Sequence, residues 1–325
     1  MGCDATYYAP IEVTVAEVRK FLALLGGTSV PSAPWHKRLF GYHFIPEERY
    51  ESYGGVLVSV SADARPVEVY TRTTITRSKA DTATNNYVLR ELKGHFGGYF
   101  VSDEGRNKYF TNWRPDRKRA EAGCFMAFIR YDESSCRMMF AFRYEPMPSP
   151  EQRRMLIEVG MAPPECVLAN VFLPMLVSNL ENFFRGTYTA ILKYSSDLPK
   201  IAASARLDQS DWREIVSKES SIEEAVSRSR SFQNVDKILA AFKEVEPRMD
   251  FLALLAKPFS GRKSQASVWL RSLFERRHSL IHDGALDAAY TPEIFKVDVK
   301  KANALVRRVY RGVCHHHKWV FDVNF

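Results

Sequence analysis

The stretch LPMLVSNLENFFRGTYTAIL, residues 173–192, decides the fold of the second half of the chain. Its large apolar residues recur at intervals of three or four, at Leu173, Leu176, Leu180, Phe183 and Phe184. An α-helix has about 3.6 residues per turn, so this spacing gathers them into one apolar stripe. The stretch therefore predicts a long helix with one face in a core.

Four more helical patterns follow it. They run through residues 215–226, 238–242, 268–281 and 302–313. The connections between them are short and polar, which favours antiparallel packing of successive helices. We expect an antiparallel all-α bundle over residues 165–325.

The first half of the chain has a different period. Val56, Val58 and Val60 alternate with other residues, as they do in a strand buried on one face. Thr14 and Glu17 have the spacing of a capping box at the start of a helix. A hairpin is predicted to turn at residues 103–105, after a helix that a Gly97-Gly98 pair ends. These patterns predict an α+β domain with antiparallel strands over residues 1–150.

A second hairpin is predicted near the end of this domain. Phe125–Tyr131 and Met138–Tyr144 are rich in aromatic residues and flank the polar segment DESSC. Two proline-rich segments follow, EPMPSP at 145–150 and MAPPE at 161–165. Proline-rich segments commonly join domains, so the boundary is placed between residues 150 and 165.

Composition limits the classes of protein to consider. The chain has 325 residues, a hydrophobic content of 46% and a net charge of +8, which is compatible with a polyanionic partner. Its five cysteines are scattered singly, which argues against a disulfide framework and for the reducing cytoplasm. No uninterrupted apolar run approaches 18 residues and no secretory signal is recognised. We expect a cytoplasmic protein that does not span a membrane.

The segment FERRHSLIHDG, residues 274–284, concentrates ionisable groups near a helix end. Arg277 and His282 are five residues apart, about 140° around an ideal helix. Gly284 stands where a C′ glycine would, which puts His282 in the last turn. There the helix dipole and Asp283 favour the imidazolium form. An imidazolium beside an arginine can clamp a phosphate and act as a general acid, although a basic last turn is also ordinary helix capping.

This segment resembles the signature of the HEPN superfamily of ribonucleases, in which an arginine precedes a polar residue and then a histidine. Two upstream stretches carry the likeness further: VSNLENFFRGTYTAILK resembles the first long helix of that family, and RSFQNVDKILAAFK resembles a stretch of its RiboL-PSP-like branch. The resemblance covers about residues 168–316. The N-terminal half matches no named domain.

The resemblance implies a homodimer in which Arg277 and His282 of both subunits meet at the twofold axis. It implies metal-independent RNA cleavage, in which the ribose 2′-OH attacks the adjacent phosphate and leaves a 2′,3′-cyclic phosphate. His282 would then transfer the proton and Arg277 would stabilise the phosphorane. His278 would orient its neighbours or the substrate, and Glu181 would hold Arg277 or His282.

Glu181 has a plainer interpretation, an ion pair with Arg276. For the dimer interface, Trp269, Leu273 and Leu280 are the predicted apolar core.

Further contacts with RNA are predicted from basic residues. Arg276 adjoins the motif, and the segment WRPDRKR supplies Trp113, Arg114, Arg117, Lys118 and Arg119. Arginines with an aromatic residue suit phosphate contact and base stacking, whereas the alternative is an exposed charged loop. The segment CHHHKW, residues 314–319, is interpreted as a solvated basic helix end, because consecutive histidines on a helix point about 100° apart. We assign no metal ligand and no cofactor.

Two functions follow from these patterns. The first is an endoribonuclease of the toxin or phage-defence type, in which the N-terminal domain selects RNA or senses a trigger. An antitoxin or a trigger protein would then be a partner. The second is a non-catalytic HEPN-like module that dimerises or binds RNA or nucleotide, with the main activity in the N-terminal domain.

Overall fold

The computed structural model describes residues 2–30, 39–45, 52, 54–61, 63–74, 77–111, 117, 119–144, 149–158, 163–259, 265–284 and 286–321. Two compact units are present, which divide between Ala122 and Gly123. The first is an α+β unit and the second is helical, as the sequence predicts.

Within the described residues, the first unit contains one antiparallel sheet of seven strands. The strands are β1 (Asp4–Tyr8), β2 (Thr28–Val30), β3 (Leu39–Phe44), β4 (Val56–Ser61), β5 (Glu68–Thr73), β6 (Tyr99–Ser102) and β7 (Gly105–Arg106). Their order across the sheet is β2-β3-β4-β5-β1-β6-β7. In β4 the side chains of Val56, Val58 and Val60 are buried whereas Leu57 is exposed, so the predicted alternation is confirmed.

Helices α1 (Val15–Leu24) and α2 (Lys79–Phe96) pack against this sheet and against each other. The capping box predicted at Thr14 and Glu17 starts α1. The ring of Phe21 in α1 stacks on His95 in α2, with ring centroids 4.3 Å apart. Both helices therefore cover the same face of the sheet.

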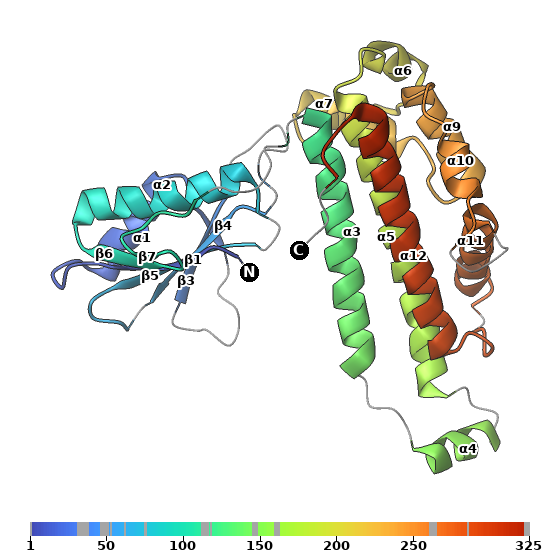
Figure 1. Cartoon of the computed structure of the whole chain (residues 1–325), viewed down its shortest axis with the longest axis horizontal. Helices are drawn as coiled ribbons and strands as arrows, with labels where there is room; N and C mark the ends of the chain where they lie inside the picture. Colours follow the sequence, from blue (N-terminus) through green and yellow to red (C-terminus); the bar gives the residue numbers. More distant parts are fainter. Residues whose placement is uncertain are drawn as a thin grey trace. The chain divides into compact units, whose positions relative to one another are not determined.

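The described part of the second unit is built from helices alone, apart from one isolated bridge. Their bounds are α3 (Arg119–Tyr144), α4 (Pro150–Glu158), α5 (Pro164–Lys193), α6 (Leu198–Ser204), α7 (Gln209–Val216), α8 (Ile222–Arg228), α9 (Val235–Val245), α10 (Phe251–Ala256), α11 (Ala266–His282) and α12 (Pro292–His317). Figure 1 shows α3, α5 and α12 running side by side as the three long helices of the unit. Helices α9 and α11 pack on α5, and α10 packs on α12.

Aromatic contacts hold the long helices together. Phe128 of α3 stacks on Tyr310 of α12, with ring centroids 4.8 Å apart. Tyr131 of α3 meets Phe183 of α5 edge to face at 6.1 Å. A Cβ added to Gly186 would lie 3.1 Å from the Cβ of Ala127, so a glycine at this point permits the close approach of α3 and α5.

The hairpin predicted from Phe125–Tyr131 and Met138–Tyr144 is wrong, because both segments belong to the continuous helix α3. The linking DESSC contains no glycine, proline or asparagine that would turn the chain. Residues 122–129 are all buried, and beyond them the buried positions recur every three or four residues, at Tyr131, Ser135, Met138 and Phe142. Aromatic residues favoured the strand interpretation, but the helical period and the packing on α5 and α12 decide the structure.

This error also moves the division of the chain. The units divide after Ala122, whereas the boundary predicted from the sequence lies between residues 150 and 165. Most of α3 lies in the helical unit, where it packs on α5 and α12. The proline-rich segments flank α4 within that same unit.

Helix α5 is long and apolar enough, by length and composition alone, to cross a membrane. Its most apolar window has a mean hydropathy of 1.3, but 50% of that window is buried inside the unit. Leu173, Leu176 and Leu180 have no exposed surface. This burial identifies α5 as the central helix of a protein core.

Candidate functional site

The helix that carries the FERRHSLIHDG segment ends as predicted. The last residue of α11 is His282, and Asp283 follows as the C-cap with its N–H donating to the carbonyl of Ser279 at 2.8 Å. Gly284 has a φ of 63°, in the left-handed region that glycine adopts without strain. His282 is thereby placed in the last turn, at the negative end of the helix dipole.

Two imidazole rings lie together on the exposed side of this helix end. The ring centroids of His278 and His282 are 4.1 Å apart, with an angle of 42° between the planes. Both residues are exposed. A pair at positions i and i+4 shares one helix face, so this contact follows from the spacing.

Arg277 lies on the opposite, packed side of α11. Residues of the same face, Leu270, Leu273 and Phe274, are buried in the core. Arg277 itself is half-buried, and its Nε is buried without a hydrogen-bond partner. In one protomer Arg277 and His282 therefore point in different directions, in agreement with their separation of about 140° on an ideal helix.

Glu181 is buried in the middle of α5, with an exposed fraction of 6%. Its Oε2 accepts a hydrogen bond from Nε2 of Gln233 at 3.4 Å, and its Oε1 is buried without a partner. Within the described part of the chain, Glu181 is hydrogen-bonded to neither Arg277 nor His282. Its expected role of holding one of them is not seen in the protomer.

Arg276 is part of an internal network rather than free for RNA. Its Nε lies 3.1 Å from Oδ2 of Asp287, and its Nη1 lies 4.0 Å from Oδ2 of Asp298. Its guanidinium also lies over the ring of Tyr290, 4.7 Å from the centroid. The alternative pairing of Arg276 with Glu181 is therefore wrong, because its partners come from the loop after α11 and from α12.

Asp298 of α12 is the centre of this network. The carboxylate accepts hydrogen bonds from Nε1 of Trp269 at 2.8 Å and from the hydroxyl of Tyr290 at 3.2 Å. Burial raises the pKa of Tyr290, and the neighbouring Asp298 raises it further. The network joins α11 to α12 and fixes the loop that follows His282.

Two of the three residues predicted for the dimer interface are corrected by their burial, whereas Leu280 is partly exposed. Trp269 and Leu273 have exposed fractions of 7% and 2%, so both belong to the core of the protomer. They face inward because α11 packs on α5 and α9 along that side. The exposed apolar residues on α11 are instead Val268 at 54% and Ile281 at 47%.

The basic segment before α3 is described only in part. Trp113, Arg114 and Lys118 lie outside the described residues. The side chain of Arg117 is buried, and its Nε lies 3.9 Å from Oε1 of Glu121. Arg117 is therefore not exposed for contact with RNA, contrary to the prediction. Arg119 is exposed at the start of α3.

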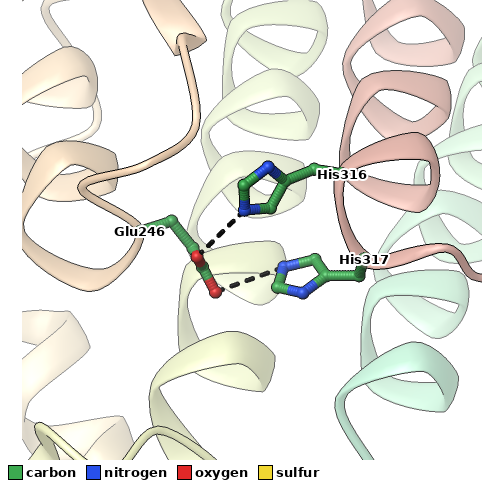
Figure 2. A group of neighbouring side chains, drawn as sticks. All are labelled: Glu246, His316 and His317. Atoms are coloured by element: carbon green, nitrogen blue, oxygen red, sulfur yellow. Dashed lines mark ion pairs between the residues drawn. The ribbon is translucent and has the colours of Figure 1, made fainter.

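A second group of polar side chains lies near the other end of α12, and the sequence analysis did not find it. Figure 2 shows His316 and His317 projecting from the end of α12 toward Glu246, which follows α9. Nε2 of His316 lies 3.3 Å from Oε2 of Glu246, and Nε2 of His317 lies 3.2 Å from Oε1. The interpretation of CHHHKW as a solvated helix end is wrong for these two histidines, because Glu246 covers them.

Local structure explains how neighbouring histidines reach one carboxylate. His317 is the last residue of α12, and Lys318 has a left-handed φ of 58°. His317 also stacks on Trp319, with ring centroids 4.2 Å apart. Both histidines are still residues of α12, and each ring reaches a different oxygen of the Glu246 carboxylate, so rings that leave the helix about 100° apart share one partner.

Electrostatics favour the ionised form of the carboxylate in this group. Burial by itself raises the pKa of Glu246, but His317 and His316 outweigh burial and hold that pKa below its usual range. Side chains so arranged can form an ion-pair cluster or offer three ligand atoms to a cation, and those atoms lie within 4.8 Å of one another.

A cationic pocket of about 690 Å³ adjoins this group between α10 and α12. Its charged and histidine lining residues include Asp250, Lys257, Arg307, Arg308, Arg311, His315 and His316. Arg308 donates to the carbonyls of Lys257 at 2.6 Å and Pro258 at 2.9 Å, so it closes the end of α10. Lys257, Arg307 and Arg311 are exposed cations that can attract an anion.

Comparison with protein-family models, with curated proteins and with solved structures finds no match to this chain.

Proposed function

We propose that the chain is a metal-independent endoribonuclease of HEPN type. The observation that carries the proposal is the pairing of His278 and His282, exposed at the C-terminal end of α11 with ring centroids 4.1 Å apart. An exposed imidazole at the negative end of a helix is suited to hold and release a proton. The helical unit around α5 and α11 also agrees with the all-α bundle that the resemblance implies.

In the proposed reaction the ribose 2′-OH attacks the adjacent phosphorus and loses its proton, while the bond to the leaving 5′ oxygen breaks and that oxygen gains a proton. The products are a 2′,3′-cyclic phosphate and a 5′-hydroxyl. His282 transfers a proton, His278 orients His282 or the substrate, and Arg277 stabilises the negative charge of the phosphorane. Glu181 is hydrogen-bonded to Gln233 in the protomer, so it is given no part in this step.

The reaction as proposed needs a second copy of the chain. Arg277 faces the packed side of α11 and His282 faces the exposed side, so one helix does not direct both at one phosphate. A twofold axis beside the end of α11 would bring two copies of His282 together, with the guanidinium groups approaching from the two helices. The half-exposed position of Arg277 leaves part of its side chain available for this approach.

The proposed setting is the cytoplasm, where the enzyme acts as a toxin or in phage defence. The N-terminal α+β unit then selects RNA or senses a trigger, and an antitoxin or trigger protein is the proposed partner. The five cysteines are scattered singly along the sequence, a usage that suits a reducing compartment.

The test is RNA cleavage by purified wild type, His282→Ala and His315→Ala. His315 is an exposed histidine near the other end of α12, so it controls for the loss of a surface imidazole. We expect cleavage with cyclic phosphate ends by the wild type and by His315→Ala, and a loss of at least about 100-fold in His282→Ala. Equal cleavage by His282→Ala and wild type refutes the proposal.

One observation favours the non-catalytic alternative, namely the cationic pocket between α10 and α12. A pocket with three exposed cations suits binding of RNA or nucleotide without chemistry. If that is the function, Arg307→Gln with Arg311→Gln should weaken RNA binding and reduce its salt dependence, while His282→Ala leaves binding unchanged. Fluorescence anisotropy with labelled RNA at several salt concentrations separates the two functions.

A further inference from the structure

The ligand atoms of Glu246, His316 and His317 have the arrangement of a metal site. Two imidazole nitrogens and two carboxylate oxygens from α12 and the end of α9 face one another (Figure 2). We propose that these three residues bind one divalent transition-metal ion of the zinc class. The proposal does not depend on the ribonuclease activity.

The two nitrogen–oxygen distances in this group are compatible with ligands of a shared ion. Zinc binds imidazole nitrogen and carboxylate oxygen at about 2.0–2.1 Å, so two ligands at a tetrahedral angle lie about 3.3 Å apart. The nitrogen–oxygen separations of 3.3 and 3.2 Å, each to a different oxygen of the Glu246 carboxylate, are close to that spacing. Charge-assisted hydrogen bonds between such groups are shorter, about 2.7–2.9 Å.

The hydrogen-bond geometry of His317 supports the same conclusion. Its Nε2 is buried and has no hydrogen-bond partner, although a carboxylate oxygen lies 3.2 Å away. A buried polar nitrogen without a partner is costly in a folded protein. A metal ion between the nitrogen and Glu246 would use the nitrogen lone pair, with the ring proton on Nδ1.

Backbone structure holds the three ligands in place without the ion. Helix α9 ends before Pro247, and Glu246 is its C-cap, with an N–H that donates to the carbonyl of Phe242 at 2.9 Å. At the end of α12, the N–H of Trp319 donates to the carbonyl of Cys314 at 2.8 Å. The Trp319 ring stacks on His317 and limits its rotation. Contacts of this kind keep the side chains that bind a metal ion in the correct orientation.

The donor set identifies the class of ion. Two imidazoles and one carboxylate suit zinc and its neighbours in the first transition row, whereas calcium and magnesium prefer oxygen ligands alone. Three protein ligands leave a coordination position for water or another ligand. Since His316 also lines the cationic pocket, the proposed ion lies at the edge of that pocket.

The experiment measures metal binding by the full-length protein after chelation and dialysis. Zinc is titrated by calorimetry, and cobalt is added in parallel because tetrahedral cobalt absorbs in the visible range. The variants are Glu246→Gln, His316→Ala with His317→Ala, and His315→Ala as the matched control. His315 adjoins the ligands in sequence but is exposed and outside the group. Circular dichroism melting of each apoprotein checks that the variants fold.

We expect one zinc per wild-type chain, with the same affinity in His315→Ala. Affinity should fall at least about 100-fold in both ligand variants, since each loses ligands of the ion. The proposal is overturned if the folded wild type binds no stoichiometric zinc or cobalt, which would leave an ion-pair cluster only. It is equally overturned if the ligand variants bind zinc with the affinity of the wild type.

Discussion

The rings of His278 and His282 lie 4.1 Å apart on the exposed side of α11. Arg277, which precedes His278 in sequence, is directed to the packed side, with its Nε buried. One helix end therefore presents its imidazoles to solvent and keeps its arginine partly inside. The arrangement assigns the two histidines different roles, because His282 is closer to the helix end and its dipole.

The role of His278 can be tested with a variant that lacks the imidazole nitrogens but keeps an aromatic ring at this position. In His278→Phe the contact with His282 is kept and the ring nitrogens are lost, whereas His278→Ala removes both. If His278 positions His282, His278→Phe should keep cleavage within about tenfold of wild type and His278→Ala should lose more. Single-turnover cleavage rates measure this. Equal, large losses in both variants would instead give His278 a direct part in proton transfer.

Assembly at the twofold axis can be tested with mixed dimers. Arg277→Ala and His282→Ala subunits are each expected to be inactive, since each lacks one half of the proposed machinery. Mixing them should restore partial cleavage, because one intact arginine and one intact histidine then meet across the axis. Native mass spectrometry confirms that mixed dimers form. Formation of mixed dimers without any cleavage would contradict the sharing of these residues between subunits.

Chelation distinguishes the two candidate sites. Helix α12 has 26 residues, about 39 Å of length, and it separates the end of α11 from the group of Glu246, His316 and His317. The proposed cleavage uses the 2′-OH of the RNA and protein side chains, so cleavage should survive EDTA that removes zinc. Cleavage is followed before and after chelation, with metal content measured on the same sample. Activity lost with zinc and restored by it would transfer the chemistry to the group at Glu246.

Local signals predicted much of this structure. The Thr14 cap, the strand Val56–Ser61 and the end of α11 at Gly284 each depend on neighbouring residues, and all three are confirmed. Helix α3 was mistaken for a hairpin because aromatic residues are common in strands, while its packing partners are distant in sequence. Glu246 could not be paired with His317 because nothing in the local sequence of either indicates the other.

The burial of Arg277 and Trp269 shows a second limit. The sequence spacing of Arg277 and His282 predicts the angle between them around the helix. It does not predict which side of the helix faces the core. Only the packing of α11 on α5 and α9 shows that Trp269 and Leu273 face inward. An amphipathic pattern with apolar residues on several sides leaves that choice open.

The Asp298 network should contribute measurably to stability. Asp298 has an exposed fraction of 4% and interacts with Trp269, Tyr290 and Arg276. Loss of its charge in Asp298→Asn should lower the free energy of unfolding of the helical unit by about 3 kcal/mol, since a buried charge partner is removed. Urea unfolding followed at 222 nm measures the loss.

A matched control is Asp236→Asn. Asp236 forms an ion pair with Arg271 at 2.6 Å, but both side chains are largely exposed, so this change should cost no more than about 1 kcal/mol. Equal effects of the two substitutions would show that the buried network adds no stability beyond that of a surface pair.

The proposed dimer interface predicts a specific sensitivity at Ile281. This residue precedes His282 and has an exposed fraction of 47%, so a charge there should not disturb the protomer core. In a dimer that joins two α11 ends, Ile281→Glu places like charges close together across the axis and removes apolar contact. We expect a monomer by light scattering, with unchanged melting of the protomer and little cleavage.

Val216→Glu is the control, because Val216 is an apolar residue on α7 with an exposed fraction of 81%. It should leave both dimer and cleavage intact. A monomeric Ile281→Glu variant that cleaves RNA at the wild-type rate would show that one protomer suffices, despite the divergence of Arg277 and His282. A variant that stays dimeric with full activity would place the interface elsewhere on the molecule.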